Sequence, residues 1–149
     1  KVDALYDVIY SMTNTAIKVR KEKYERQKLH GIVFLMVDSM KERKRIWEES
    51  IKMKPTIELL IEPRMGLNLG RIYTVNPVDM THIEEYEKTY YSDDTAEVSA
   101  CGASMTVVTT AMTIASMCAR QLINHSNDIE LDNEIIVDLM YNNFMNRSW

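Results

Sequence analysis

The strongest structural signal in the chain is an uninterrupted apolar run, Gly31-Ile-Val-Phe-Leu-Met-Val37, which ends at Asp38. An apolar run without alternation predicts a strand covered on both faces, as the strands of parallel sheets are. Directly after it, Ser39-Met-Lys-Glu42 has the spacing of a capping box, so we expect a helix to begin there and to continue to about Lys52, before Pro55. A strand that passes at once into a helix favours the α/β class.

Other segments extend this pattern on both sides. The spacing of apolar residues predicts a helix over 2–12, and β-branched residues predict a short strand over 16–19. Three further strands are expected, together with a short helix and several loops or turns. The strands are 56–61, 71–75 and 134–140, the helix runs from Asp79 to Lys88, and the loops or turns are 21–28, 64–70 and 91–98.

Residues 98–119 form a stretch of 22 residues without a charged side chain. Its length would permit a membrane span. Seven of these residues are Ser or Thr and the ends carry no aromatic belt, so we predict a buried helix, with a membrane span as the minor alternative. Ala111, Ala115 and Ala119 recur every four residues, which predicts a helix face that another backbone can approach closely.

The composition limits the classes of function. A chain of 149 residues is expected to hold one domain with a sizeable core. Its 18 basic and 22 acidic residues give a net charge of −4, which creates no general attraction for nucleic acid. Two cysteines exclude a disulfide scaffold and favour a cytoplasmic protein. Glycine is scarce, with four residues.

Asp38 is the most informative candidate for chemistry, because ligands of open parallel sheets bind beyond the carboxyl ends of the strands. If Ser39 caps the following helix, the Asp38 carboxylate is left to face a metal-bound phosphate, since Mg²⁺ is held by one or two carboxylates and substrate oxygens. The competing interpretation is that Asp38 itself caps the helix.

The cysteines and histidines carry weaker signals. Cys101 precedes the long apolar helix and is a candidate nucleophile, with a small buried hydrophobe as the alternative, whereas Cys118 is expected in the core. The histidines are isolated, and no spacing typical of a metal site is present.

Several stretches, taken in order, resemble ThiF/MoeB-type adenylyltransferases, the family that includes the ubiquitin-activating enzymes. The start of the chain is similar to the family's K-V-E-A-L helix, and the strand ending at Asp38 with Arg43 after it resembles its D-x-x-x-x-R pattern. The Cys101 region resembles the family's C-x-x-A-G region. The stretches that carry the resemblance are Lys1-Val-Asp-Ala-Leu5, Val33-Phe-Leu-Met-Val-Asp38, Pro63-Arg-Met-Gly66, Ile72-Tyr-Thr-Val75, Tyr86 to Ser92 and Cys101-Gly-Ala-Ser104.

The resemblance implies an enzyme that uses ATP and Mg²⁺ to adenylate the C-terminal carboxylate of a ubiquitin-like or sulfur-carrier protein, or of a peptide. It implies that Lys1 contacts the nucleotide phosphates, that Asp38 serves Mg²⁺ and ATP, and that Ser39 lies beside it at the nucleotide. It further implies that Arg43 belongs to this region, with a possible structural role, and that Cys101 can bond covalently to the carrier. A homodimer is expected, and no membrane partner.

The chain also departs from the family. The glycine-rich phosphate loop, the acidic residue that holds the ribose and an arginine-bearing helix precede the position of Lys1 in the family and are absent here, as are the zinc-binding C-x-x-C pairs. We therefore expect residues 1–149 to be the C-terminal portion of a Rossmann-like, mostly parallel sheet flanked by helices. One mononucleotide-binding half, roughly 80–120 residues, would be missing. The segment alone is expected to bind no ATP with physiological strength, and no structural zinc.

Two other functions remain open at this point. The first is a non-catalytic ThiF-fold scaffold or dimerisation module, which upstream sequence without glycine-rich and arginine elements would favour. The second is an unrelated nucleotide or NAD domain, which an acidic ribose-binding residue after the second strand would favour.

Overall fold

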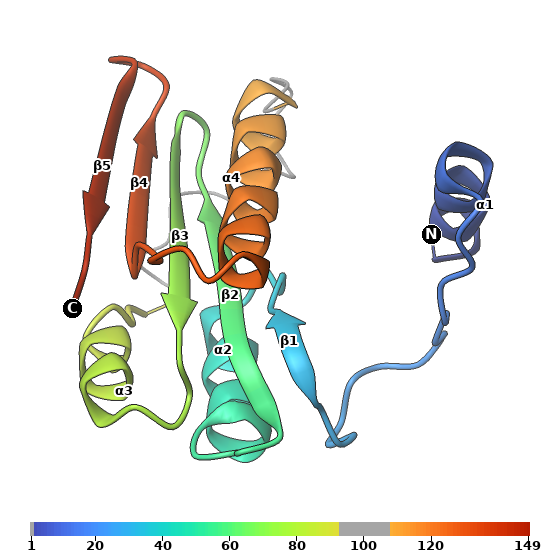
Figure 1. The fold of residues 1–149 in the computed structure, drawn as a ribbon, viewed down its shortest axis with the longest axis horizontal. Coiled ribbons are helices and arrows are strands. Elements are labelled where there is room, and N and C mark those ends of the chain that lie inside the picture. Colours follow the sequence, from blue (N-terminus) through green and yellow to red (C-terminus); the bar gives the residue numbers. More distant parts are fainter. Residues whose placement is uncertain (1, 93–107) are drawn as a thin grey trace.

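The computed structural model describes residues 2–92 and 108–149 as one five-stranded sheet flanked by helices (Figure 1). The strands lie in the order in which they follow in the chain, from β1 to β5. The class is therefore α/β, as predicted. The elements are α1 (Val2–Thr13), β1 (Gly31–Phe34), α2 (Met40–Ile46), the π-helical turn η1 (Trp47–Ile51), β2 (Ile57–Met65), β3 (Leu69–Val75), α3 (Met80–Glu87), α4 (Val108–Ser126), β4 (Glu134–Asp138) and β5 (Asn143–Arg147).

The sheet is mixed rather than mostly parallel. Among the described strands, only β1 and β2 pair in parallel, while β2–β3, β3–β4 and β4–β5 pair antiparallel. The cause is the connection after Met65: the chain turns within three residues, and so short a link can join only antiparallel neighbours. A turn does occur within the predicted range 64–70, but it is shorter than predicted, because β2 continues through Pro63 and Arg64 to Met65.

The β1–α2 unit is confirmed. Ser39 is the N-cap of α2, its Oγ accepting from the amide of Glu42 at 3.3 Å, as the capping box predicts. A parallel neighbour requires a crossover, and α2 with η1 supplies it between β1 and β2. The burial of β1 was predicted wrongly, because β1 is the edge strand of the described sheet and its residues are half-buried or, at Phe34, exposed.

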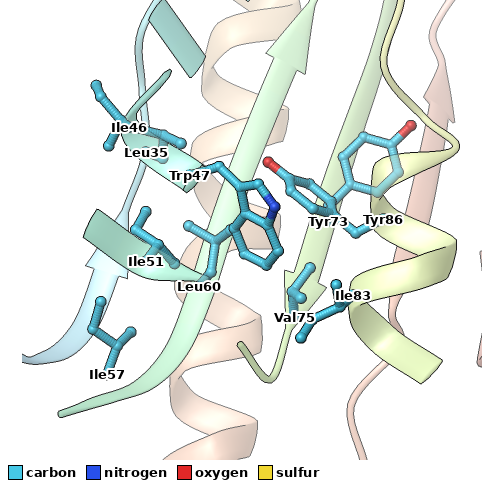
Figure 2. Packing of buried hydrophobic residues seen from close by; sticks show 10 residues of the cluster. All are labelled: Leu35, Ile46, Trp47, Ile51, Ile57, Leu60, Tyr73, Val75, Ile83 and Tyr86. Atoms are coloured by element: carbon cyan, nitrogen blue, oxygen red, sulfur yellow. The ribbon is translucent and has the colours of Figure 1, made fainter. Parts of the chain in front are cut away.

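Alternation along the strands divides the core between the two faces of the sheet. Leu60, Tyr73 and Val75 face α2, η1 and α3 (Figure 2), whereas Leu59, Ile61 and Ile72 face α4. The largest buried side chain of the first face is Trp47, whose ring meets that of Tyr86 edge-on at 4.7 Å. The second cluster is completed by Ile114, Cys118, Ile135 and Val137.

Helix α4 covers its sheet face with one side only. The buried residues are Thr110, Ile114, Cys118 and Gln121, so Cys118 lies in the core as predicted. Ala115 and Ala119 are exposed and Ala111 is half-buried, so the approach of another backbone to this alanine face stays a prediction. Close approach occurs at Gly70 of β3, which lies directly under Ile114. No helix within the described residues is long and apolar enough to cross a membrane.

The N-terminal segment and the C-terminal hairpin each agree with prediction only in part. Helix α1 forms as expected, but none of its residues is buried, and it lies apart from the sheet in Figure 1. The strand predicted over 16–19 is absent, since this part of the chain has no regular structure. The predicted last strand forms as β4, and β5, which follows it in an antiparallel hairpin, was not foreseen.

Candidate functional site

The candidate site lies where the chain leaves β1 and enters α2. Leu35 still pairs with the sheet, its amide donating to the Ile61 carbonyl at 3.1 Å, and the chain then leads through Val37 to Asp38. Asp38 is exposed, and because Ser39 caps α2, the Asp38 carboxylate is not the cap. The competing interpretation of Asp38 is thereby removed. An exposed carboxylate at the carboxyl end of a parallel strand fits a group that meets a metal-bound phosphate.

Arg43 lies beneath this loop and is buried, with 4% of its surface exposed. Its Nη1 donates to the Leu35 carbonyl at 3.3 Å and to Glu62 Oε1, and its Nη2 donates to the Val37 carbonyl. The resemblance placed Arg43 with the nucleotide-binding residues. The structure shows the structural role that was left open, because the guanidinium is directed to the loop backbone and to a buried carboxylate.

Glu62 is the centre of this network and is fully buried. Besides Arg43, it accepts from Arg64 Nε at 2.8 Å, from Arg64 Nη2 at 2.9 Å and from the Tyr86 hydroxyl at 2.5 Å. Two guanidinium groups therefore share one carboxylate, which leaves an excess positive charge in the interior. A buried charge is tolerated only when it is hydrogen-bonded and paired, so each of these contacts matters.

Arg64 lies among aromatic rings. Its guanidinium is 4.4 Å from the centre of the Tyr73 ring and 5.7 Å from that of Tyr90. It also donates to the Thr89 carbonyl at 2.7 Å and to its hydroxyl at 2.9 Å. Burial alone would lower the pKa of Arg64, but the hydrogen bond and charge of Glu62 raise it. The rings thus hold a permanent cation at this face of the sheet.

The phenol of Tyr86 is a neutral donor. Burial, followed by the charge of Glu62, raises its pKa well above the ordinary value. Burial likewise raises the pKa of the neighbouring Tyr90 phenol. The network therefore contains two cations, one anion and hydroxyls that keep their protons at any physiological pH.

The predicted site residues are only partly brought together. Asp38, Ser39 and Arg43 share the β1–α2 connection, while Lys1 and Cys101 lie outside the described residues. Residues 2–92 and 108–149 contain no group of three acidic, histidine or cysteine side chains placed to hold a metal ion. Asp38 is thus a single carboxylate that fits Mg²⁺ when phosphate oxygens supply other ligands.

Cys118 has no nucleophilic character. It is 3% exposed, and burial raises its pKa to about 11. A thiol of this kind stays protonated at neutral pH and behaves as a small apolar side chain.

Two features of the structure were not predicted from the sequence. The predicted strand ended at Ile61 and Arg64 was placed in a turn, so the buried ion pair of Glu62 and Arg64 was not foreseen, although charged residues next to an apolar run are themselves a signal of such a pair. The second feature is a cleft of about 400 Å³ at the start of β2 and the end of β3, lined by His82, His125 and Trp149. Glu58, Leu59, Thr74, Asn76, Glu130, Leu131, Asn133 and Ser148 complete its lining.

No family model, no curated protein and no solved structure matches this chain.

Proposed function

We propose that the chain is the C-terminal portion of a ThiF/MoeB-type adenylyltransferase domain with a Rossmann-like core. The observation that carries the proposal is the β1–α2–β2 unit, which places Asp38 at the carboxyl end of a parallel strand and leaves its carboxylate free of capping duty. The motif order quoted above supports the same assignment. In this proposal the nucleotide-binding half of the sheet belongs to sequence upstream of residue 1 and continues the sheet beyond β1.

The proposed reaction joins a carboxylate to AMP. A carboxylate oxygen of the acyl donor attacks the α-phosphorus of ATP, the bond to the bridging oxygen breaks, and pyrophosphate leaves. Bound Mg²⁺ would neutralise charge on the phosphates. Asp38 would hold that ion, and Ser39 would lie beside the nucleotide. Lys1 would contact the phosphates, and the Cys101 thiol would be the candidate acceptor of the activated acyl group.

The proposed partners follow from this chemistry. The acyl donor would be the C-terminus of a ubiquitin-like or sulfur-carrier protein, or a peptide, and the enzyme would act as a homodimer in the cytoplasm. The net charge of −4 supports neither nucleic acid nor an anionic membrane as a partner.

The test is ATP–pyrophosphate exchange by the full-length gene product with a panel of candidate carrier proteins. We expect Asp38→Asn to reduce exchange by roughly two orders of magnitude, because a metal ligand on the phosphates is lost. Asp128→Asn is the matched control: Asp128 is exposed, has a positive φ of 52° that Asn tolerates, and lies in the turn after α4. Exchange that is unchanged in Asp38→Asn would refute the assignment of Asp38.

A second candidate function is a non-catalytic scaffold or dimerisation module of the same fold. The specific observation in its favour is α1, where Leu5, Val8 and Met12 are exposed and no residue is buried. Such an apolar helix is suited to pack against another chain. A full-length protein that dimerises through α1 but shows no exchange with any carrier would favour this function.

A further inference from the structure

We propose that Arg43, held by Glu62 and Tyr86, is a positioning residue that sets the backbone leading into Asp38, and thereby the affinity of the site for Mg-ATP. The inference deepens the proposed function and rests on it. It assigns a role to a buried network that the resemblance does not explain.

The first step is the geometry of the loop. Arg43 donates to the carbonyls of both Leu35 and Val37, on either side of Met36 and beyond the last residue of β1. The Val37 carbonyl belongs to the peptide unit that joins Val37 to Asp38. Because a peptide unit is planar, an arginine that holds this oxygen also restricts the orientation of the Asp38 backbone.

The second step is the rigidity of Arg43 itself. Its guanidinium is planar and makes three contacts from two nitrogens, so its plane is set by Glu62 of β2 as well as by the loop. Glu62 is in turn held by the Tyr86 hydroxyl of α3 at 2.5 Å. The loop that carries Asp38 is therefore connected through side chains to the middle of the sheet and to α3.

The third step compares arginine with lysine at position 43. A lysine at position 43 would keep the positive charge beside Glu62 but would lack the planar fork that reaches two carbonyls and a carboxylate together. Arg43→Lys should therefore loosen the loop while leaving the ion pair with Glu62 possible.

Arg45 provides a matched control on the same helix. It also donates to two backbone carbonyls, those of Tyr24 and Glu25, at 3.1 and 3.2 Å, and it also pairs with carboxylates, those of Glu42 and Glu49. Its contacts hold residues 24–25 rather than the Asp38 loop. Arg45→Lys thus removes the same kind of contact from a different segment.

The experiment measures two quantities on the full-length protein: the apparent KM for Mg-ATP in pyrophosphate exchange, and hydrogen exchange of the Leu35 amide, which donates to the Ile61 carbonyl, relative to the amides of residues 134–138. In Arg43→Lys we expect KM to rise by about tenfold with a smaller change in kcat, since a displaced loop weakens positioning of the bound ligand. We also expect faster exchange of the Leu35 amide, with no change at residues 134–138. Arg45→Lys should leave KM within about twofold of the wild type.

Tyr86→Phe covers the case in which Arg43→Lys does not fold, because it removes one hydrogen bond and no charge. It should raise KM in the same direction by a smaller factor. The inference would be overturned if Arg43→Lys and Arg45→Lys had equal KM and equal exchange of the Leu35 amide. If Arg43→Lys does not fold, the same equality between Tyr86→Phe and the wild type would overturn it. A wild-type protein without pyrophosphate exchange would refute the proposed function instead, and the role of Arg43 in holding the loop would then be decided by amide exchange alone.

Discussion

Gly70 of β3 and Ile114 of α4 approach so closely that a Cβ at position 70 would lie 2.1 Å from Ile114 Cδ1 and 2.7 Å from its Cγ1. Gly70 does not have the positive φ that would itself call for glycine, so space alone requires it. Ile114 is 5% exposed and belongs to the cluster between α4 and the sheet. The contact therefore sets the distance between the helix and this face.

We expect Gly70→Ala to lower the free energy of unfolding by about 1–3 kcal/mol, because the added methyl group overpacks a buried contact. Urea denaturation measures the loss. In an Ile114→Val background, which removes Cδ1, the same substitution should cost less. Strictly additive effects of the two changes would contradict the close contact as the cause.

The second prediction concerns the contribution of Glu62 to stability. Glu62→Gln should destabilise the fold by about 3–5 kcal/mol, because it leaves two buried guanidinium groups without a balancing charge. Glu58, whose side chain is 67% exposed, provides the comparison. Glu58→Gln should change stability by no more than about 0.5 kcal/mol. Similar losses in the two variants would show that Glu62 does not compensate the arginines.

The capping assignment can be tested by thermodynamics as well as by activity. Ser39→Ala should cost about 1 kcal/mol of stability, since the side-chain acceptor for the Glu42 amide is lost. Asp38→Ala should change stability much less, because Asp38 does not cap α2. If chemical denaturation showed a larger loss of stability in Asp38→Ala than in Ser39→Ala, Asp38 would be the residue that caps α2.

Cys118 gives the fold a defined pH dependence. Burial raises its pKa from 9.0 to about 11, so the folded protein binds this proton more tightly than the unfolded chain does. The contribution to stability is fully present below pH 9.0 and is lost as the pH rises toward about 11. The stability advantage of the wild type over Cys118→Ala should therefore shrink across this interval in thermal unfolding. An advantage that is constant over the interval would mean that the thiol is not desolvated in the folded state.

Local sequence signals were sufficient where one short segment carries its own hydrogen bonds. The capping box at Ser39, the helix ending in η1 and the helix opened by Asp79 all appear as predicted, because caps are satisfied by residues two or three positions away. The burial of Cys118 was also predictable, since it lies inside a long stretch without charge. Asp38 could also be identified from the local sequence, because it is the polar residue that ends an apolar run.

The contacts between distant segments could not be predicted from the local sequence. Arg43 and Glu62 are 19 positions apart, and nothing in the spacing of either residue reveals the other. The buried face of α4 could not be predicted from the sequence either. Thr110, Ile114 and Cys118 recur at the same four-residue spacing as the three alanines, and only the sheet beneath selects between the two faces. Strand β5, with every residue exposed, lacks the apolar run that identified the other strands.

By itself the sequence determined the α/β class, the β1–α2 unit with Asp38 at its junction, and the burial of the Cys118 thiol. Only the tertiary structure decided the direction of the strands, the face of α4 that is buried, and the contacts of Arg43. The physical reason is range: caps and apolar runs depend on neighbouring residues, whereas strand pairing and a buried ion pair depend on which distant segments share one face of the sheet.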